Sequence, residues 1–480
     1  MDLKKILNLE FGFSNFREGQ EEIISSLLQQ KNTFAVLPTG TGKSLCYQFA
    51  GRMLEGTVLV VSPLISLMDD QVRQLQKSGE RRVIAFNSSL SYSEKKHVSG
   101  RLSDYKYLFI SPESLMNESV MQKLKQMKLA LFVIDEAHCV SQWGVDFRPE
   151  YVKIKDVLKI LGFPLTLALT ATASDSVKEE IRQHLFQENI EIQQYFYSVN
   201  RNNISLSVEI TEDKDAVLFK FLDKFNQSGI IYCTSRKTTE RISCLINEKL
   251  GIRTAFYHGG LSTAERGKIQ QQFVDNDIQL LCATNAFGMG IDKPDIRLIL
   301  HYDCSASLEN YVQEIGRAGR DGMSSQAVLL YRHGDEFIHY FFQNEVTEEL
   351  KILQRLVQSE MDFSEGLFNS LSEIQQKWLE GYLNGSYTFD QLRKRLIEKR
   401  IERQYQLHQM LEYIQTKNCR RIFVMDYFSE KGKVGRKDSC CDNCGLEFPT
   451  AENDQKLSES PANTESGWQE ILIRLFKVNE

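Results

Sequence analysis

The sequence predicts an α/β protein in which two tandem parallel-sheet lobes are followed by a helical subdomain. Short β-branched runs alternate with helical patterns from about residue 30 to residue 335, a break in this series falls near residues 198–207, and the strand signal disappears after residue 335. Such alternation is typical of parallel sheets. Two series of this kind are most simply explained by two lobes.

The expected elements follow in order along the chain. The first series predicts strands at residues 33–37, 57–61, 83–86, 107–110, 131–134 and 165–170. The second predicts strands at residues 228–233, 253–257, 279–283, 297–301 and 325–330. Residues 336–418 carry long charged helical stretches, including 390–403, and residues 446–467 are polar and turn-rich. We therefore predict lobes at 1–203 and 204–335, a helical subdomain at 336–445, and a linker with a short amphipathic tail helix at 446–480.

The composition is that of a soluble globular protein. The 480 residues include 58 Lys and Arg against 64 Asp and Glu, a net charge of −6, with 42% hydrophobic and 25% charged residues. These values exclude global disorder and argue against non-specific coating of nucleic acid or membrane by positive charge. No apolar run approaches the roughly 18 residues of a membrane helix. The start has no signal-peptide pattern, so we expect a cytoplasmic protein that does not act in a membrane.

A glycine-rich segment at residues 38–44 predicts a phosphate-binding loop. It follows an apolar strand and precedes a helical pattern, which is the context of a P-loop, although an ordinary glycine-rich turn is the alternative. In a P-loop, backbone N–H groups approach phosphate oxygens, Lys43 reaches the β- and γ-phosphates, and Ser44 ligates Mg²⁺. Leu37 stands where the general motif has Gly, which fits the helicase version of the loop. The predicted ATP-binding residues here are Thr39, Gly40, Thr41, Gly42, Lys43 and Ser44.

Charged residues elsewhere predict phosphoryl-transfer chemistry. Asp135 and Glu136 directly follow the predicted strand at 131–134, where Asp135 would hold Mg²⁺ and Glu136 would orient or deprotonate the attacking water. Alone, such a pair is equally well a solvated turn. Arg317 and Arg320 lie three residues apart on one helical face of the second lobe, and a bland surface helix is their alternative. We predict that both act as arginine fingers and that, with Lys43, these four residues catalyse ATP hydrolysis.

These segments, in this order, resemble those of a superfamily 2 helicase, and other segments resemble the RecQ family of DNA helicases. Residues 11–20 are similar to that family's adenine-recognition motif, although Glu18 stands where the family usually has Pro. The resemblance implies that Gln20 reads the adenine edge, that Phe13 stacks on the base and that Arg17 assists. An amphipathic entry helix is the alternative explanation.

Residues 139–151 are similar to the aromatic-rich loop of the RecQ family. Aromatic rings beside an arginine offer stacking surfaces for single-stranded bases together with attraction for phosphate. We expect Trp143, Phe147 and Arg148 to contact DNA and to couple that contact to hydrolysis, since the loop adjoins the catalytic acids. The alternative is that the two aromatic side chains fill a core.

Further helicase-like segments occur in order at residues 62–72, 111–115, 170–173, 232–236, 257–260 and 283–294. Several end a predicted strand with small hydroxyl or Gly residues, whose backbone N–H groups can hold a phosphodiester chain. Each segment alone is more often an ordinary strand-to-helix turn, so the prediction rests on their number and order. The DNA-binding or coupling residues predicted from them are Ser235, Arg236, His258 and Thr284.

Four cysteines near the C-terminus predict a structural metal site. Cys441 and Cys444 have Cys-x-x-Cys spacing, and Cys419 and Cys440 complete the four thiolates of a tetrahedral Zn²⁺ site. Free thiols or a redox pair are the alternatives. The cluster resembles the zinc-binding subdomain of the RecQ family. A site closed by four protein ligands should have no catalytic role, so we predict that Zn²⁺ joins the long helices to the second lobe.

Two further segments are open to more than one interpretation. After Cys444 only 36 residues remain, so the resemblance implies a short RecQ form without winged-helix and HRDC domains. We favour docking of the tail helix at 465–480 on the protein's own core over partner binding. The basic run at 392–403 is more typical of a solvated helix face than of a surface for duplex DNA.

The two RecA-like lobes that the resemblance implies predict a DNA-stimulated, ATP-dependent DNA helicase. It would translocate 3′-to-5′ on single-stranded DNA and unwind duplex DNA in repair and recombination, with Mg²⁺ bound alongside ATP and with structural Zn²⁺. Expected partners are ATP, single-stranded and forked DNA, and single-stranded-DNA-binding or repair proteins, with nucleoid association if the protein is bacterial. The alternatives are an RNA-dependent ATPase that remodels RNA, and a non-catalytic DNA-binding scaffold that uses nucleotide as a clamp.

Overall fold

The computed structural model describes residues 2–142, 151, 153–187, 190–223, 225–287, 293–358, 371–383, 385, 387–430 and 440–446. Three predicted DNA-contact residues, Trp143, Phe147 and Arg148, lie outside these residues. The tail beyond residue 446 lies outside them as well. Among the described helices, none is both long enough and apolar enough to cross a bilayer.

The first lobe contains a parallel sheet whose central strands are buried on both faces. In the described residues its strand order is β3-β4-β2-β5-β6-β1-β7. Continuous apolar strands such as β2 and β5 form there because helices cover both faces and leave no solvent side. The strands are β1 Thr33–Val36, β2 Thr57–Val61, β3 Val83–Phe86, β4 Tyr107–Ile110, β5 Leu129–Ile134, β6 Thr166–Thr170 and β7 Gln193–Phe196.

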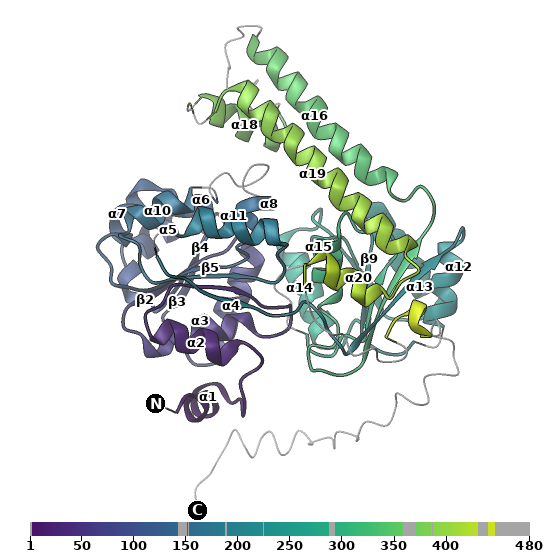
Figure 1. The fold of residues 1–480 in the computed structure, drawn as a ribbon, viewed down its shortest axis with the longest axis horizontal. Coiled ribbons are helices and arrows are strands. Elements are labelled where there is room, and N and C mark those ends of the chain that lie inside the picture. Colours follow the sequence, from purple (N-terminus) through teal and green to yellow (C-terminus); the bar gives the residue numbers. More distant parts are fainter. Residues whose placement is uncertain are drawn as a thin grey trace, which may run out of the picture.

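The helices of the first lobe divide between the two faces of this sheet (Figure 1). One apolar core joins the sheet to α1, α2, α3 and α4, and another joins its other face to α5, α7, α10 and α11. The helices are α1 Leu3–Phe11, α2 Gln20–Leu28, α3 Lys43–Met53, α4 Ile65–Lys77, α5 Tyr92–Ser99, η1 Leu102–Asp104, α6 Pro112–Leu115, α7 Glu118–Leu124, α8 Cys139–Gln142, α10 Ile154–Ile160 and α11 Asp175–Leu185.

The second lobe repeats this plan with strand order β10-β11-β9-β12-β13-β8 in the described residues. Helices α12 and α13 cover one face, and α14 and α15 cover the other. Its strands are β8 Ile204–Ile210, β9 Gly229–Tyr232, β10 Thr254–Tyr257, β11 Leu280–Ala283, β12 Leu298–His301 and β13 Ser325–Tyr331. Its helices are α12 Lys214–Leu222, α13 Arg236–Leu250, α14 Thr263–Val274 and α15 Leu308–Ile315.

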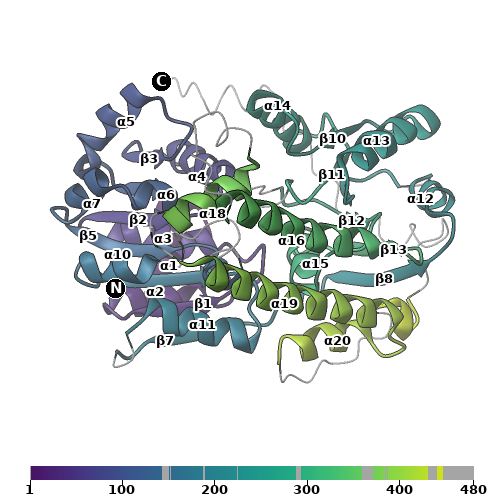
Figure 2. The ribbon, with the colours of Figure 1, turned by 90° about the horizontal axis from the view of Figure 1, so that it is seen from above.

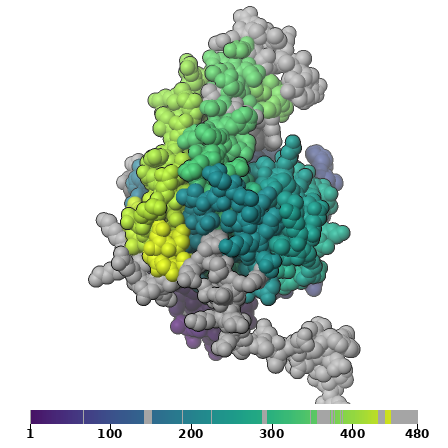
Figure 3. Space-filling view, turned by 90° about the vertical axis from the view of Figure 1, so that its right-hand side faces the viewer, coloured from purple at the N-terminus to yellow at the C-terminus, as the bar shows by residue number. Residues whose placement is uncertain are grey.

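A helical subdomain extends from the second lobe. Helices α16 (Phe337–Gln358) and α19 (Phe389–Gln415) run side by side and reach toward the first lobe (Figure 2). Near their far end, α18 (Glu373–Leu383) closes a small core of its own around Trp378. The chain then returns to the second lobe as α20 (Arg420–Tyr427) and η2 (Asp442–Cys444). Figure 3 shows this yellow segment against the teal surface of lobe 2, at the foot of α19.

The predicted fold class is confirmed, and the strands that the sequence did not predict are both edge strands. All eleven predicted strands overlap observed ones, but β7 and β8 were not expected. The burial of β7 alternates between half-buried and exposed residues, and β8 lies in the segment that we predicted to separate the lobes. Edge strands with polar alternation do not produce the continuous apolar run of a central parallel strand.

A buried ion cluster fixes the base of α16 to the second sheet. The Nζ atom of Lys214 lies 2.9 Å from a carboxylate oxygen of Asp303, after β12, and 2.9 Å from one of Asp335, before α16. The other Asp303 oxygen accepts a 2.8 Å hydrogen bond from the backbone of Thr234, after β9. One buried lysine therefore joins three loops.

Replacing this lysine tests the cluster. Lys214→Met leaves two largely buried carboxylates without their cation, and we expect it to lower the free energy of unfolding by about 3 kcal/mol. Urea unfolding followed by circular dichroism measures the loss. Lys220→Met, on the exposed face of the same helix, is the matched control and should change stability little. Equal stability of the two variants would contradict the inferred role of the cluster.

Candidate ATP site and zinc site

The predicted P-loop forms the turn between β1 and α3. Gly42 caps α3 with a φ of +77°, a conformation that favours glycine, and Lys43 and Ser44 begin the helix. The first N–H groups of a helix have no partner within it, and the helix dipole places partial positive charge there. This end of α3 is therefore suited to hold phosphate groups.

The predicted adenine motif is bound directly to the P-loop. Gln20 donates through Nε2 to the carbonyls of Thr41 and Gly42, at 2.7 and 3.1 Å, and accepts at 2.9 Å from the backbone N–H of Arg17. The Arg17 guanidinium donates to the carbonyl of Gly40. In this structure the Gln20 amide thus supports the P-loop, whereas Phe13 is about half exposed and lines the cleft described below.

The predicted acids lie beside the P-loop at the end of β5. Asp135 and Glu136 are buried, and the Lys43 Nζ atom lies 3.8 Å from a Glu136 oxygen. Burial, followed by the charge of Glu136, raises the pKa of Asp135 well above its ordinary value. Two buried carboxylates beside a serine hydroxyl are hard oxygen donors that fit Mg²⁺, whose charge would favour the ionised form of Asp135.

The acids are also linked to the end of the neighbouring strand β6. His138 Nδ1 lies 3.4 Å from the second Glu136 oxygen and 2.8 Å from the hydroxyl of Thr170. Burial lowers the pKa of His138, which therefore stays neutral at neutral pH. His138 thus links the acids that follow β5 to Thr170 at the end of β6.

The second lobe contributes Arg317 and Arg320 to the same cleft. The cleft has a volume of about 530 Å³, within the range of ligand pockets. It is lined from the first lobe by the adenine motif, the P-loop and the two acids, and from the second by Pro294, Gln313 and both arginines. The structure therefore brings together the residues of all three predicted catalytic segments.

The two lobes touch directly behind this cleft. A Cβ atom on Gly316 would lie only 1.7 Å from the Thr39 hydroxyl, so a larger residue at this position would require the Thr39 side chain to move. Arg201, which the sequence analysis did not single out, donates 2.7 and 3.1 Å hydrogen bonds to the carbonyls of Thr39 and Gly316. In the sequence, Arg201 stands out only as an arginine among asparagines between the two series of strands. Its hydrogen-bond partners are backbone carbonyls, which residue types do not reveal.

The predicted DNA-contact residues of the second lobe lie at one edge of its sheet. Ser235 caps α13 after β9, and Arg236 begins that helix. His258 follows β10 and lies 3.0 Å from a Glu240 oxygen, while Thr284 follows β11. Since β10, β11 and β9 are neighbours in a parallel sheet, the structure gathers all four residues at its carboxyl edge.

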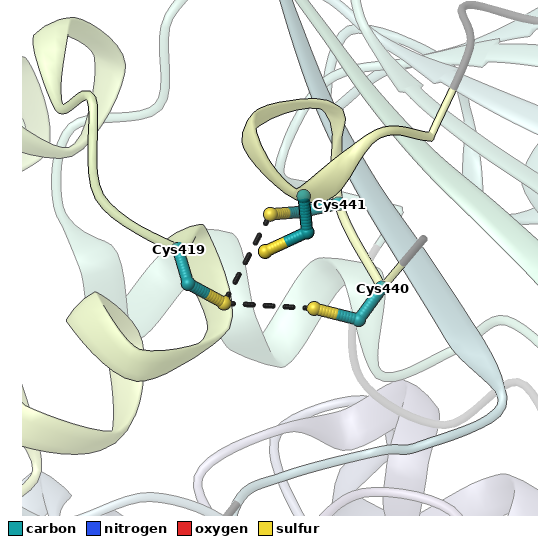
Figure 4. Close-up of side chains that lie close together, drawn as sticks. Cys419, Cys440 and Cys441 are labelled. Carbon is teal, nitrogen blue, oxygen red and sulfur yellow. Dashed lines mark hydrogen bonds between the residues drawn. The ribbon is translucent and has the colours of Figure 1, made fainter. Parts of the chain in front are cut away.

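The four predicted zinc ligands are close together. Their sulfur atoms all lie within 4.8 Å of one another, and Cys419 Sγ is 3.5 Å from Cys440 Sγ and 4.0 Å from Cys441 Sγ (Figure 4). Tetrahedral Zn–S bonds of about 2.3 Å place sulfurs about 3.8 Å apart, so this donor set fits Zn²⁺. Cys419 caps α20, and the other three adjoin the edge strand β8 through a backbone bridge between Leu206 and Cys441.

Three family models match the chain. DEAD/DEAH box helicase matches residues 17–180, Helicase conserved C-terminal domain matches 213–322, and RecQ zinc-binding matches 386–445. The probable ATP-dependent DNA helicase RecS of Bacillus subtilis is 40% identical over 99% of this chain and 98% of that relative. The chain belongs to the RecQ family of ATP-dependent DNA helicases.

Other relatives differ from this RecQ-family chain in length and in name. The ATP-dependent DNA helicase RecQ of Haemophilus influenzae is 35% identical over 92% of this chain, which spans 62% of that protein. A protein of Acanthamoeba polyphaga mimivirus named putative ATP-dependent RNA helicase R290 is 33% identical over 99% of this chain and 77% of its own length. Mycobacterium smegmatis helicase Lhr bound to single-stranded DNA shares the fold, with a TM-score of 0.56 at 20% identity over 75% of this chain and 50% of Lhr.

The RecQ zinc-binding match, together with the sulfur geometry, identifies the four cysteines as a structural Zn²⁺ site. Zn²⁺ would tie the end of α19 and the start of α20 to the loop beside β8. The predicted resemblance and the zinc cofactor are therefore confirmed.

Loss of zinc should destabilise this corner of the molecule. Cys441→Ser removes a buried ligand, and we expect loss of bound Zn²⁺ and a fall in Tm of about 5 °C or more. Elemental analysis and thermal unfolding measure the two effects. Cys244→Ser, at an exposed thiol remote in sequence from the cluster, is the matched control. Full zinc content in Cys441→Ser would show that this residue is not a ligand.

Proposed function

We propose that this RecQ-family chain hydrolyses ATP in the interlobe cleft and uses each cycle to move 3′-to-5′ along single-stranded DNA, separating duplex DNA ahead. One observation carries the proposal. The cleft brings Lys43, Asp135 and Glu136 of one lobe together with Arg317 and Arg320 of the other. Neither lobe alone holds groups for the phosphates, the attacking water and the developing charge.

We assign the first-lobe residues to binding and to the attacking water. Lys43 and the N–H groups of residues 39–44 would hold the phosphates, and Ser44 and Asp135 would hold Mg²⁺, which would neutralise phosphate charge. Glu136 orients the attacking water and accepts its proton. Its 3.8 Å contact with Lys43 supports this role, because it places the carboxylate beside the phosphates that Lys43 holds.

We assign Arg317 and Arg320 to stabilisation of charge in the transition state. Arg317 is buried, it lines the cleft, and its Nε atom has no hydrogen-bond partner among the described residues. A buried guanidinium with free donor capacity suits an anion that arrives with the nucleotide. Hydrolysis would then depend on the approach of the second lobe, which links the state of the nucleotide to the distance between the lobes.

The DNA strand is proposed to cross the carboxyl edges of both sheets. Ser235, Arg236, His258 and Thr284 lie on that edge of the second lobe, and the catalytic acids end a strand at the same edge of the first. Changes in lobe spacing would therefore change the spacing of DNA contacts. The 3′-to-5′ direction rests on the resemblance to the RecQ family.

An RNA-dependent ATPase is the second candidate. The name of the mimivirus relative favours it. Proteins of this fold have also been solved with either nucleic acid, Mycobacterium smegmatis Lhr with single-stranded DNA and Saccharomyces cerevisiae Dbp5 with RNA. The 40% identity to RecS over 99% of this chain, together with the zinc-binding match, favours DNA as the nucleic acid on which this chain acts. A scaffold that only binds nucleotide is disfavoured by the complete set of groups in the cleft.

Steady-state hydrolysis separates these candidates. We expect ATP hydrolysis to be stimulated strongly by single-stranded DNA and weakly by single-stranded RNA. Lys43→Ala should reduce kcat at least about 100-fold, because it removes a charge that contacts the transferring phosphate. Lys31→Ala, an exposed lysine before β1, is the matched control and should leave the rate unchanged.

Other patterns of stimulation would support the other two candidates. Preferential stimulation by RNA would favour the remodelling ATPase, and absence of hydrolysis with any nucleic acid would favour the scaffold. Displacement of a labelled strand from duplexes with either a 3′ or a 5′ single-stranded tail then tests direction. Unwinding that requires a 5′ tail would contradict the proposed 3′-to-5′ movement.

The remaining expectations stay predictions. They are the division of the chain at residues 203, 335 and 445, the action on forked DNA in repair and recombination, the partnership with single-stranded-DNA-binding or repair proteins, and the cytoplasmic or nucleoid localisation. The adenine contact of Gln20 and the aromatic-loop contacts also stay predictions.

A further inference from the structure

The segment that joins the two lobes, residues 198–204, is held along its length by α20 of the zinc subdomain. Arg421 donates to the side-chain oxygen of Asn200 and, at 2.9 Å, to the carbonyl of Arg201, and it also donates to the carbonyl of Ile204. Just after the same helix, Glu430 accepts a 2.6 Å hydrogen bond from the backbone N–H of Val199 and another from the Ser198 hydroxyl. The interlobe segment is therefore hydrogen-bonded to a residue near the start of α20 and to one just beyond its end.

The same segment directs one side chain at both halves of the nucleotide site. Through Nη1, Arg201 donates to the carbonyl of Thr39, in the P-loop, at 2.7 Å, and to that of Gly316 at 3.1 Å. Through Nη2, it donates to the carbonyls of Ala318 and Gly319, at 3.2 and 2.6 Å. Three of these carbonyls belong to the turn that carries Arg317 and Arg320.

Only an arginine can donate from one side chain to these four carbonyls in two lobes. The planar guanidinium carries five donors in a fixed geometry, so one residue can hold carbonyls from two lobes in a set relation. The surroundings are tightly packed, because the cavity bounded by Thr39, Val199, Ile315 and Val424 measures only about 30 Å³. A change in the position of α20 is therefore transmitted to the segment and not absorbed by empty space.

We propose that Arg201 is a positioning residue that sets the P-loop against the turn bearing Arg317 and Arg320, and that α20 controls it through Arg421 and Glu430. The zinc subdomain thereby regulates the rate of ATP hydrolysis. The contacts act in series: Cys419 and the zinc loop fix α20, α20 fixes residues 198–204, and Arg201 fixes the two arginines relative to the phosphates.

Loss of Arg201 should affect the rate of hydrolysis more than the binding of ATP. Arg201 contacts backbone carbonyls behind the loop, so its loss should leave the phosphate-binding groups of the first lobe in place. The two arginines of the second lobe would be displaced, and errors of about 1 Å in such groups cost up to about 100-fold in rate. The expected signature is a fall in kcat with little change in KM for ATP.

The test compares Arg201→Ala, Arg201→Lys, Arg421→Ala and the double variant Arg201→Ala/Arg421→Ala in the full chain. Hydrolysis is measured without nucleic acid as well as with single-stranded DNA, so that altered DNA binding cannot account for the result. We expect Arg201→Ala to lower kcat by about 10- to 100-fold with less than about a 3-fold change in KM, and Arg201→Lys to recover part of the rate. Arg421→Ala should lower kcat by a smaller factor, and the double variant should match Arg201→Ala, because residues that act in series are not additive.

Controls establish that a variant is folded and holds zinc. Zinc content and Tm are measured for each protein, and Lys417→Ala, at an exposed lysine two residues before Cys419, should behave as the unmodified chain. If Arg421→Ala loses zinc, Glu430→Ala tests the same connection at a residue outside the cysteine cluster. Unchanged kcat in Arg201→Ala would overturn the positioning role. Independent, multiplicative losses in the double variant would overturn the connection through α20.

Discussion

The division of one nucleotide site between two lobes is the constraint on which the rest of this structure depends. The first lobe holds the phosphate-binding loop and two buried acids, and the second holds two arginines. Charged side chains are buried on both sides of the site. Burial, followed by the charges of Arg320 and Arg17, lowers the pKa of Arg201 to about 10, while Asp135 has a raised pKa beside Glu136. Under the proposed function, a bound triphosphate with Mg²⁺ would compensate both groups at once, so nucleotide binding would favour approach of the two lobes.

Parallel-sheet topology explains why both kinds of functional residue lie where they do. Every strand of a parallel sheet ends at the same edge, so the loops that follow successive strands become neighbours although they are distant in sequence. In the first lobe that edge carries the P-loop after β1 and the acids after β5. In the second it carries the predicted DNA contacts after β9, β10 and β11. Movement between the two sheets would therefore move the nucleotide-binding groups and the predicted DNA contacts together.

The sequence predicted the central strands and the local motifs well, because both leave a signal within a few residues. Central strands such as β2 are continuous apolar runs, and a P-loop needs its glycines, lysine and serine at fixed spacing. The edge strands β7 and β8 lacked that signal. Arg201 was missed for a different reason: its acceptors are backbone carbonyls at Thr39 and Gly316, 162 and 115 residues away, and any residue type supplies a carbonyl.

The adjacent arginines after Cys419 show how a structural metal can influence a distant reaction. Arg420 turns inward, donating to Asp442 at 2.6 Å and to the Tyr413 carbonyl at 2.7 Å, while Asp442 also accepts from the backbone of Val208 on β8. Arg421 points the other way, to the interlobe segment. One helical turn, which begins after a zinc ligand at its cap, therefore contacts α19 and the zinc loop through Arg420 and the connection between the lobes through Arg421. Because both contacts start from the same rigid turn, the metal site can act on lobe closure without approaching the nucleotide.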